Sequence, residues 1–122
     1  MAYAGIQTML LAYKMRKSDK EFEATQIAQQ LYTAIKDSSS LGEWRDQELS
    51  KLSEDDPDYD TQVDEIENQY NEDLKDIAAW EDELEQQKSN CETEIKQLDG
   101  YISSWQSALT SNIQKSHTYG AQ

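Results

Sequence analysis

The sequence is poor in the residues that interrupt helices. Its 122 residues include one proline and four glycines, and only Pro57 and Gly100 fall between positions 57 and 114. Proline lacks the N–H that a helix interior needs, and glycine loses the most backbone entropy there. Disordered chains are usually rich in both and poor in aromatic residues, whereas this one has seven tyrosines and three tryptophans. The composition therefore predicts long helices.

Cysteine and histidine are almost absent, with only Cys91 and His117 present. One cysteine excludes an internal disulfide framework, and one histidine in a polar tail excludes histidine clusters and a Ser-His-Asp set. No glycine-rich phosphate loop occurs either. We therefore predict no enzymatic activity, no catalytic residues and no cofactor. Cys91 occupies a periodic apolar position, which favours a small buried side chain over a reactive thiol.

Long apolar runs are missing as well. Hydrophobic residues make up 36% of the chain and charged residues 30%, and no stretch approaches the roughly 20 apolar residues of a membrane span. The apolar run at 9–12 is short, and basic residues follow it rather than precede it, unlike a secretory signal. We expect a cytoplasmic protein, or one exported without a cleaved signal peptide.

Positive charge is scarce, and the formal net charge is -14. Residues 1–36 carry five basic and three acidic groups, whereas the remainder carries 6 basic and 22 acidic groups. Such a surface repels the phosphates of nucleic acids, so we predict no nucleic-acid binding. A mildly basic helix and a strongly acidic one favour pairing within or between chains. Charges that only keep a helical surface in solution explain the pattern equally well.

Apolar residues recur at heptad spacing from about residue 3 to 36. Spacing of three and four places both stripes on one helical face. The stripes are Tyr3, Leu10, Lys17, Ala24 and Leu31, and Ile6, Tyr13, Lys20, Ile27 and Ala34. Two lysines interrupt them. Either the helix breaks near Ser18, where Glu21 could complete a capping box, or it continues and the lysines meet an acidic partner.

Two turn signals follow. Residues 37–42 contain serines, aspartate and Gly42, which predicts a linker and then a short helix at about 43–53 carrying Trp44. Further on, Asp56 and Pro57 predict the N-cap and the first turn of a new helix. The chain is thus divided into 1–36, a linker with a short helix at 37–56, and 57–122.

A long acidic helix is predicted from Pro57 to about residue 115. One apolar register runs in regular heptads, through Val63, Tyr70, Ile77, Leu84, Cys91, Leu98 and Trp105. Such a helix is roughly 90 Å long, and the first helix covers only about half of it. We therefore predict an all-α fold, a long helical hairpin or coiled coil with one short intervening helix, whose uncovered part meets another chain.

These features predict a non-enzymatic, self-associating structural subunit. The predicted interface has two sides, Ile77, Leu84, Leu98, Ile102, Trp105 and Leu109 against Leu10, Ile27 and Leu31. The alternative is a heteromeric adapter or chaperone-like module that binds a basic helical partner. A minor alternative is calcium binding, because oxygen ligands follow EF-hand spacing at Asp56, Asp58, Asp60, Asp64 and Glu67. Thr61 stands where that loop requires glycine, and an acidic helix N-terminus explains the same residues.

The layout of residues 53–116 resembles the small secreted subunits of type III secretion needles and filaments. In those subunits a turn rich in Ser, Asn, Asp and Pro joins two helices, and the second helix is amphipathic and ends near the C-terminus. Ser53–Pro57 and Ala108–Ser116 are the matching segments here. The resemblance implies export without a cleaved signal and self-assembly into a helical polymer through the terminal helices.

Overall fold

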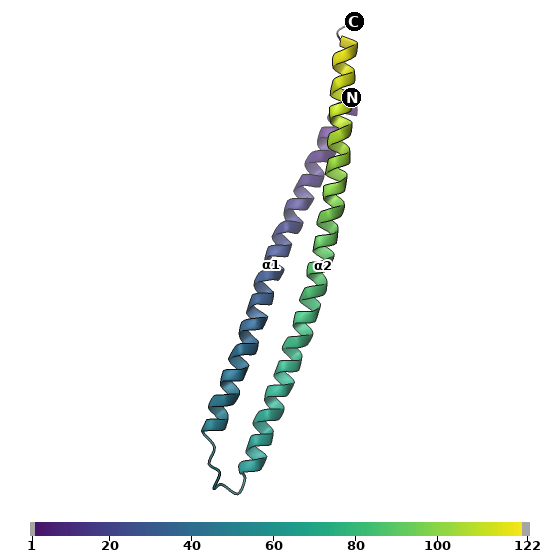
Figure 1. Ribbon diagram of the computed structural model, residues 1–122. Helices are drawn as coiled ribbons and strands as arrows, with labels where there is room; N and C mark the ends of the chain where they lie inside the picture. The colour runs from purple at the N-terminus through teal and green to yellow at the C-terminus, as the bar shows by residue number, and fades with distance from the viewer. Residues whose placement is uncertain (1, 121–122) are drawn as a thin grey trace. The chain divides into compact units, whose positions relative to one another are not determined.

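The chain folds as a hairpin of two long helices. The computed structural model describes residues 2–120, with side chains described at 4–115, and contains α1 (Ala2–Ser50) and α2 (Tyr59–Gly120) (Figure 1). No strand occurs within the described range. The predicted all-α helical hairpin is confirmed.

The first helix does not stop where the sequence predicts. α1 runs without a break through Ser18 and through residues 37–42, so neither a linker nor a separate short helix at about 43–53 is present. Gly42 keeps a negative φ and does not end the helix. The reason is tertiary, since the heptad spacing continues past position 36 and Leu41 and Glu48 are partly buried there. Packing against α2 outweighs the turn preference of the serines.

Helix α2 begins at Tyr59, two residues after the predicted Pro57, and the backbone N–H of Gln62 donates the first helical hydrogen bond to the carbonyl of Asp58. The connection at 51–58 turns around Asp56. Its carboxylate accepts a hydrogen bond from the backbone N–H of Asp58 at 2.9 Å, and its carbonyl accepts one from Tyr59 at 3.0 Å. These bonds satisfy two of the N–H groups that a helix start leaves unpaired. Pro57 stands between them, where a missing N–H costs nothing.

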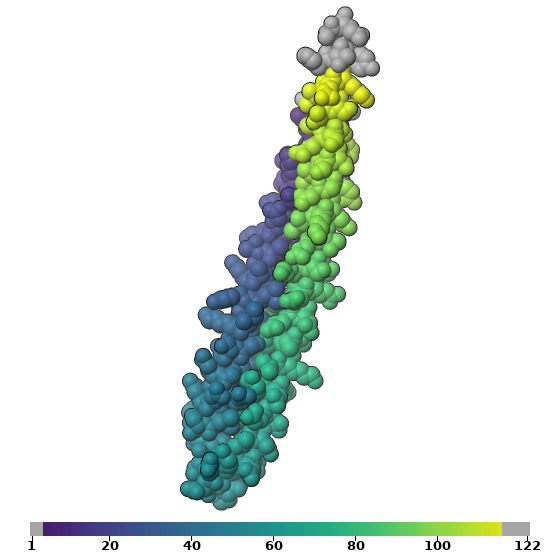
Figure 2. Space-filling view, viewed as in Figure 1, coloured from purple at the N-terminus to yellow at the C-terminus, as the bar shows by residue number. Residues whose placement is uncertain are grey.

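Two compact units make up the hairpin. Unit 1 comprises Met1–Gln26 and Lys88–Gln122, and unit 2 comprises Ile27–Gln87. Each contains one stretch of α1 beside one stretch of α2, running in opposite directions (Figures 1 and 2). Unit 1 has 7 basic and 6 acidic residues, for a net charge of +1, whereas unit 2 has 4 basic and 19 acidic residues, for -15. The charge boundary therefore differs from the one expected at residue 36.

The core of each unit is a thin seam between the two helices. The buried apolar residues of unit 1 are Ile6, Leu10, Cys91 and Leu98, and those of unit 2 are Ile27, Ala34 and Leu84. No charged or polar residue is buried among the described side chains. All seven buried residues belong to the predicted heptad registers, because one face of a helix is all that a single neighbour can cover.

The first helix covers most of the acidic helix, whereas the sequence predicted that it would cover only about half. α1 has 49 residues and α2 has 62, because α1 continues well beyond residue 36. Only in unit 1 does α2 extend past the start of α1 (Figure 1). The length mismatch is therefore a weak reason to expect another chain, and any such reason has to come from the outer faces of the helices.

Replacing a seam residue by a charged one tests this core. Leu98 is 9% exposed, so Leu98→Asp places an unpaired carboxylate in an apolar seam and should destabilise the hairpin by about 3 kcal/mol or more. The control is Gln97→Asp, which adds the same charge at the exposed neighbouring position. Urea unfolding followed by circular dichroism measures both. Equal midpoints for the two variants would show that Leu98 is not a core residue.

Candidate functional site

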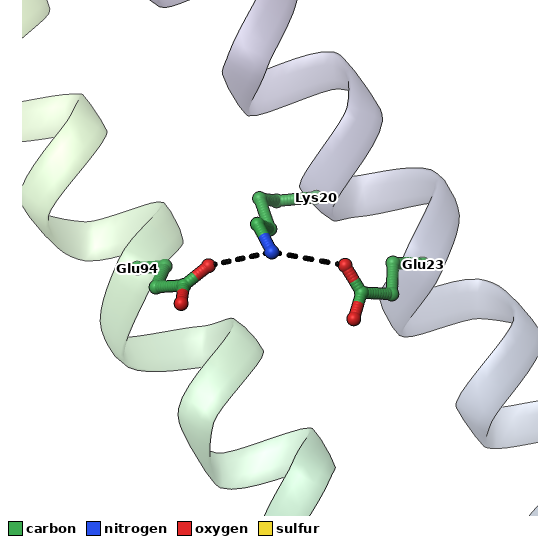
Figure 3. Close-up of polar contacts among 3 residues, drawn as sticks. All are labelled: Lys20, Glu23 and Glu94. Atoms are coloured by element: carbon green, nitrogen blue, oxygen red, sulfur yellow. Dashed lines mark hydrogen bonds and ion pairs between the residues drawn. The ribbon is translucent and has the colours of Figure 1, made fainter.

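Two lysines of α1 bridge to α2 within unit 1. The Lys17 Nζ lies 2.6 Å from an Asp99 oxygen, and the Lys20 Nζ lies 2.7 Å from Glu94 and 3.0 Å from Glu23 (Figure 3). Both lysines occupy seam positions, and each side chain is about one-third exposed. Their aliphatic stems thus fill the seam while the ammonium groups reach its edge. Of the two readings that the sequence left open, the continuous helix with lysines on an acidic partner is confirmed.

The bridges change how these lysines titrate. The hydrogen bond to Asp99 raises the pKa of Lys17 above its ordinary value of 10.5. Hydrogen bonds to Glu94 and then Glu23 raise the pKa of Lys20 further still. Hydrogen bonding to the charged form favours that form, which is the cause of both shifts. The lysines therefore remain charged wherever the hairpin is folded at ordinary pH.

A second polar cluster links the helices of unit 2. The Arg45 guanidinium lies 4.5 Å from the ring centroid of Tyr70 and 4.0 Å from a Glu67 oxygen. Stacking over an aromatic face suits the weakly hydrated guanidinium. With Lys17 and Lys20, Arg45 completes a set of three basic side chains on α1 that point toward acidic residues of α2.

The predicted interface residues lie in the seam of the hairpin itself. Leu10, Ile27, Leu84 and Leu98 are buried there, and the partly buried ones are Leu31, Ile77, Ile102, Trp105 and Leu109. The heptad register is shared by contacts within one chain and contacts between chains, so spacing could not tell them apart. Whatever binds the outside of the hairpin must use other residues.

The residues of the calcium hypothesis do not form a binding loop. α2 begins at Tyr59, so Asp60, Asp64 and Glu67 stand on a regular helix. Among the described residues, no group of three or more His, Cys, Asp or Glu side chains could hold a metal ion. An EF-hand requires its ligands to curl around the ion, and helical backbone holds them apart. Of these carboxylates, Asp60 lies in the first turn of α2, where a negative charge suits the helix dipole.

An uncharged stripe covers the outer face of α1 in unit 1. We define this outer stripe as Ala4, Thr8, Leu11, Met15, Ser18, Phe22 and Thr25, all exposed. Spacing of three and four keeps these residues in line, on the side of the helix opposite the seam. Leu11 and Met15 are each 61% exposed and Phe22 is 64% exposed. No other side chain described at 4–115 covers them.

The threonines make this stripe more apolar than the sequence suggests. The hydroxyl of Thr8 donates to the carbonyl of Ala4, and that of Thr25 donates to the carbonyl of Glu21, both at 3.0 Å. A hydroxyl bonded back to its own helix leaves the threonine methyl group as the outward surface. The spacing of Leu11, Met15 and Phe22 can be found in the sequence. It was not used as a signal because the heptads of the inner face already explained a helix with one apolar side.

Unit 2 has an open groove with an apolar floor and acidic edges. We define the acidic groove by Asp37, Leu41 and Trp44 of α1 and Asp73, Asp76 and Ile77 of α2, enclosing about 570 Å³. Leu41, Trp44 and Ile77 are partly buried. Asp73 accepts a hydrogen bond from the Gln69 amide at 2.9 Å. Within the described part of the chain, none of the three aspartates forms an ion pair.

The sequence matches no protein-family model, no curated protein and no solved structure. Along residues 2–120, neither helix has a stretch long and apolar enough to cross a membrane. The outer stripe, the acidic groove and the charges of the two units are therefore the features that bear on the function of the protein.

Alkaline titration tests the lysine bridges. Because both pKa values are higher in the folded state, the bridges contribute fully below pH 10.5, and that contribution is lost as the pH rises through the folded-state pKa. The melting temperature of the wild type should therefore fall more steeply above pH 10.5 than that of Lys17→Met/Lys20→Met. Tyrosine ionisation affects both proteins alike. Parallel curves would exclude the bridges from the stability of the hairpin.

Thiol labelling tests the packing of unit 1. Cys91 is 3% exposed, and burial, followed by the nearby Glu23 carboxylate, raises the pKa of its thiol. Both effects suppress the reactive thiolate. A disulfide reagent should label the native chain at least roughly 100-fold more slowly than the chain in urea, since labelling requires local opening. Cys91 is the only thiol, so the signal is unambiguous. Similar rates would contradict a closed seam.

Proposed function

We propose that this protein is a non-enzymatic structural subunit that associates with copies of itself through the outer stripe of α1. The observation that carries the proposal is the exposure of Leu11, Met15 and Phe22 along a stripe whose own seven residues are uncharged. Exposed apolar patches on helical proteins are typical of association sites, because burial removes apolar area from water. The seam cannot serve this purpose, since the hairpin already uses it.

The thin core supports the same proposal. The accessible surface is 9073 Å², whereas a globular monomer of 14.1 kDa exposes about 6,700 Å². Hydrophobic burial is the main favourable term in folding, and this chain buries comparatively little area. Association that covers the outer stripe adds burial that the isolated hairpin lacks.

A secreted needle or filament is the more specific form of assembly that we propose. Its support is the architectural resemblance of residues 53–116 to type III secretion subunits. A filament requires two different surfaces on each copy, so that every contact leaves another site open. Open-ended growth of mass with concentration, followed by fibres in electron microscopy, is the expected result. A fixed dimer or tetramer would contradict the filament and leave a closed oligomer.

A second candidate function is a heteromeric adapter that binds a basic helical partner. The observation that favours it is the charge of unit 2, which carries 19 acidic and only 4 basic residues. Such a surface attracts basic helices and accelerates their binding at low salt. A chain that remains monomeric at every concentration, yet binds a basic amphipathic peptide in a salt-dependent manner, would favour this candidate over self-association.

Charged substitutions on the outer stripe test the principal proposal. Leu11→Glu and Phe22→Glu each place a carboxylate where the contact buries apolar surface, so each should shift self-association to at least roughly tenfold higher concentration. Light scattering coupled to size-exclusion chromatography gives the mass over a wide concentration range. Gln30→Glu is the control, since it adds the same charge at an exposed position of α1 off the stripe. Wild-type behaviour of both stripe variants would refute this surface.

A further inference from the structure

We infer that the acidic groove of unit 2 receives the outer stripe of a second copy of the chain, with Lys14 of that copy among the groove's aspartates. The inference rests on the proposed self-association and adds which two surfaces meet. The occupant is a second copy because its unit 1 offers exposed apolar side chains and a lysine, which complement the apolar floor and the carboxylates of the groove.

The groove calls for a ligand that is both apolar and cationic. Trp44, Leu41 and Ile77 provide apolar surface that is only partly covered. Asp37, Asp73 and Asp76 line it with carboxylates that form no ion pair with any described residue. An ammonium group there gains the attraction of the carboxylates and of the tryptophan face, while its neighbours cover the apolar floor.

The middle of the outer stripe has this combination. Lys14 is three residues after Leu11 and four before Ser18, and side chains three and four apart on a helix are neighbours. All three side chains are exposed. Lys14 forms no ion pair with any described residue, unlike Lys17 and Lys20, which are engaged by α2. Its charge is thus available to another molecule.

The charges of the two units select this pairing. Contact between two copies of unit 2 brings -15 against -15, whereas unit 1, at +1, approaches unit 2 without that repulsion. At physiological ionic strength the screening length is about 8 Å, so the charge that matters is the charge near the contact. The net charge of -14 on the whole chain therefore does not prevent association through unit 1.

The contact joins two different surfaces, and each copy has one of each. Such a heterologous contact closes into a ring or a mutual pair when its rotation allows, and otherwise continues as an open filament. Single variants that disable one surface should therefore complement each other. Lys14→Ala damages the stripe and keeps the groove, whereas Asp76→Lys damages the groove and keeps the stripe.

The experiment measures the mass of each variant alone and of their mixture by light scattering. Each variant alone should require at least roughly tenfold higher concentration to associate than the wild type. The mixture should form a one-to-one complex at wild-type concentrations, because one intact stripe meets one intact groove. Lys115→Ala and Asp82→Lys are the controls, with the same substitutions at other exposed positions. Both substituted positions are exposed, and circular dichroism checks that each hairpin remains folded.

The outcomes separate this inference from the proposed function. A wild type that associates, with variants that behave like it or a mixture that forms no one-to-one complex, overturns the pairing of stripe and groove but keeps self-association. A wild type that remains monomeric at every concentration overturns both. Variants that behave as expected, together with the one-to-one complex, establish the pairing.

Discussion

The structure depends on one constraint, which is that two helices can cover only one face of each other. The heptad seam therefore carries all the burial that the chain achieves, and seven apolar residues account for its buried core. Lys17 and Lys20 enter this seam without burying their charges, because their stems pack and their ammonium groups reach acidic residues of α2. Arg45 reaches Glu67 as well, but its Nε is buried and has no hydrogen-bond partner among the described residues. The polar bridges thus extend the seam where apolar residues run out.

The same constraint leaves the outward side chains exposed to water. The residue types on the outer faces therefore indicate whether those faces contact only solvent or also another molecule. On α1 in unit 1 that face is uncharged and includes Leu11, Met15 and Phe22, which a helix that only contacts solvent does not require. In unit 2 the surface is dominated by carboxylates. The hairpin is therefore a scaffold that holds the seam constant while its outer faces differ from one unit to the other.

Regular features of the fold could be predicted from the sequence, and features set by tertiary context could not. The heptads predicted the seam residues, and Asp56 with Pro57 predicted the start of α2 to within two residues, because spacing and capping are local signals. The linker at 37–42 was wrong because packing of α1 on α2 overrides the preference of Ser38–Ser40 for turns. The outer stripe was not predicted because the heptad pattern of the inner face of α1 is more regular than the apolar spacing of its outer face.

Segregation of charge gives the proposed association its direction. If both units were neutral, any apolar surface of one copy could contact any apolar surface of another. With -15 on unit 2, a contact between two such units is opposed by repulsion, and the charge of +1 on unit 1 leaves it as the acceptable partner. Specificity obtained by penalising wrong contacts needs no additional favourable ones. A thin-cored hairpin can therefore associate selectively through a weak apolar surface.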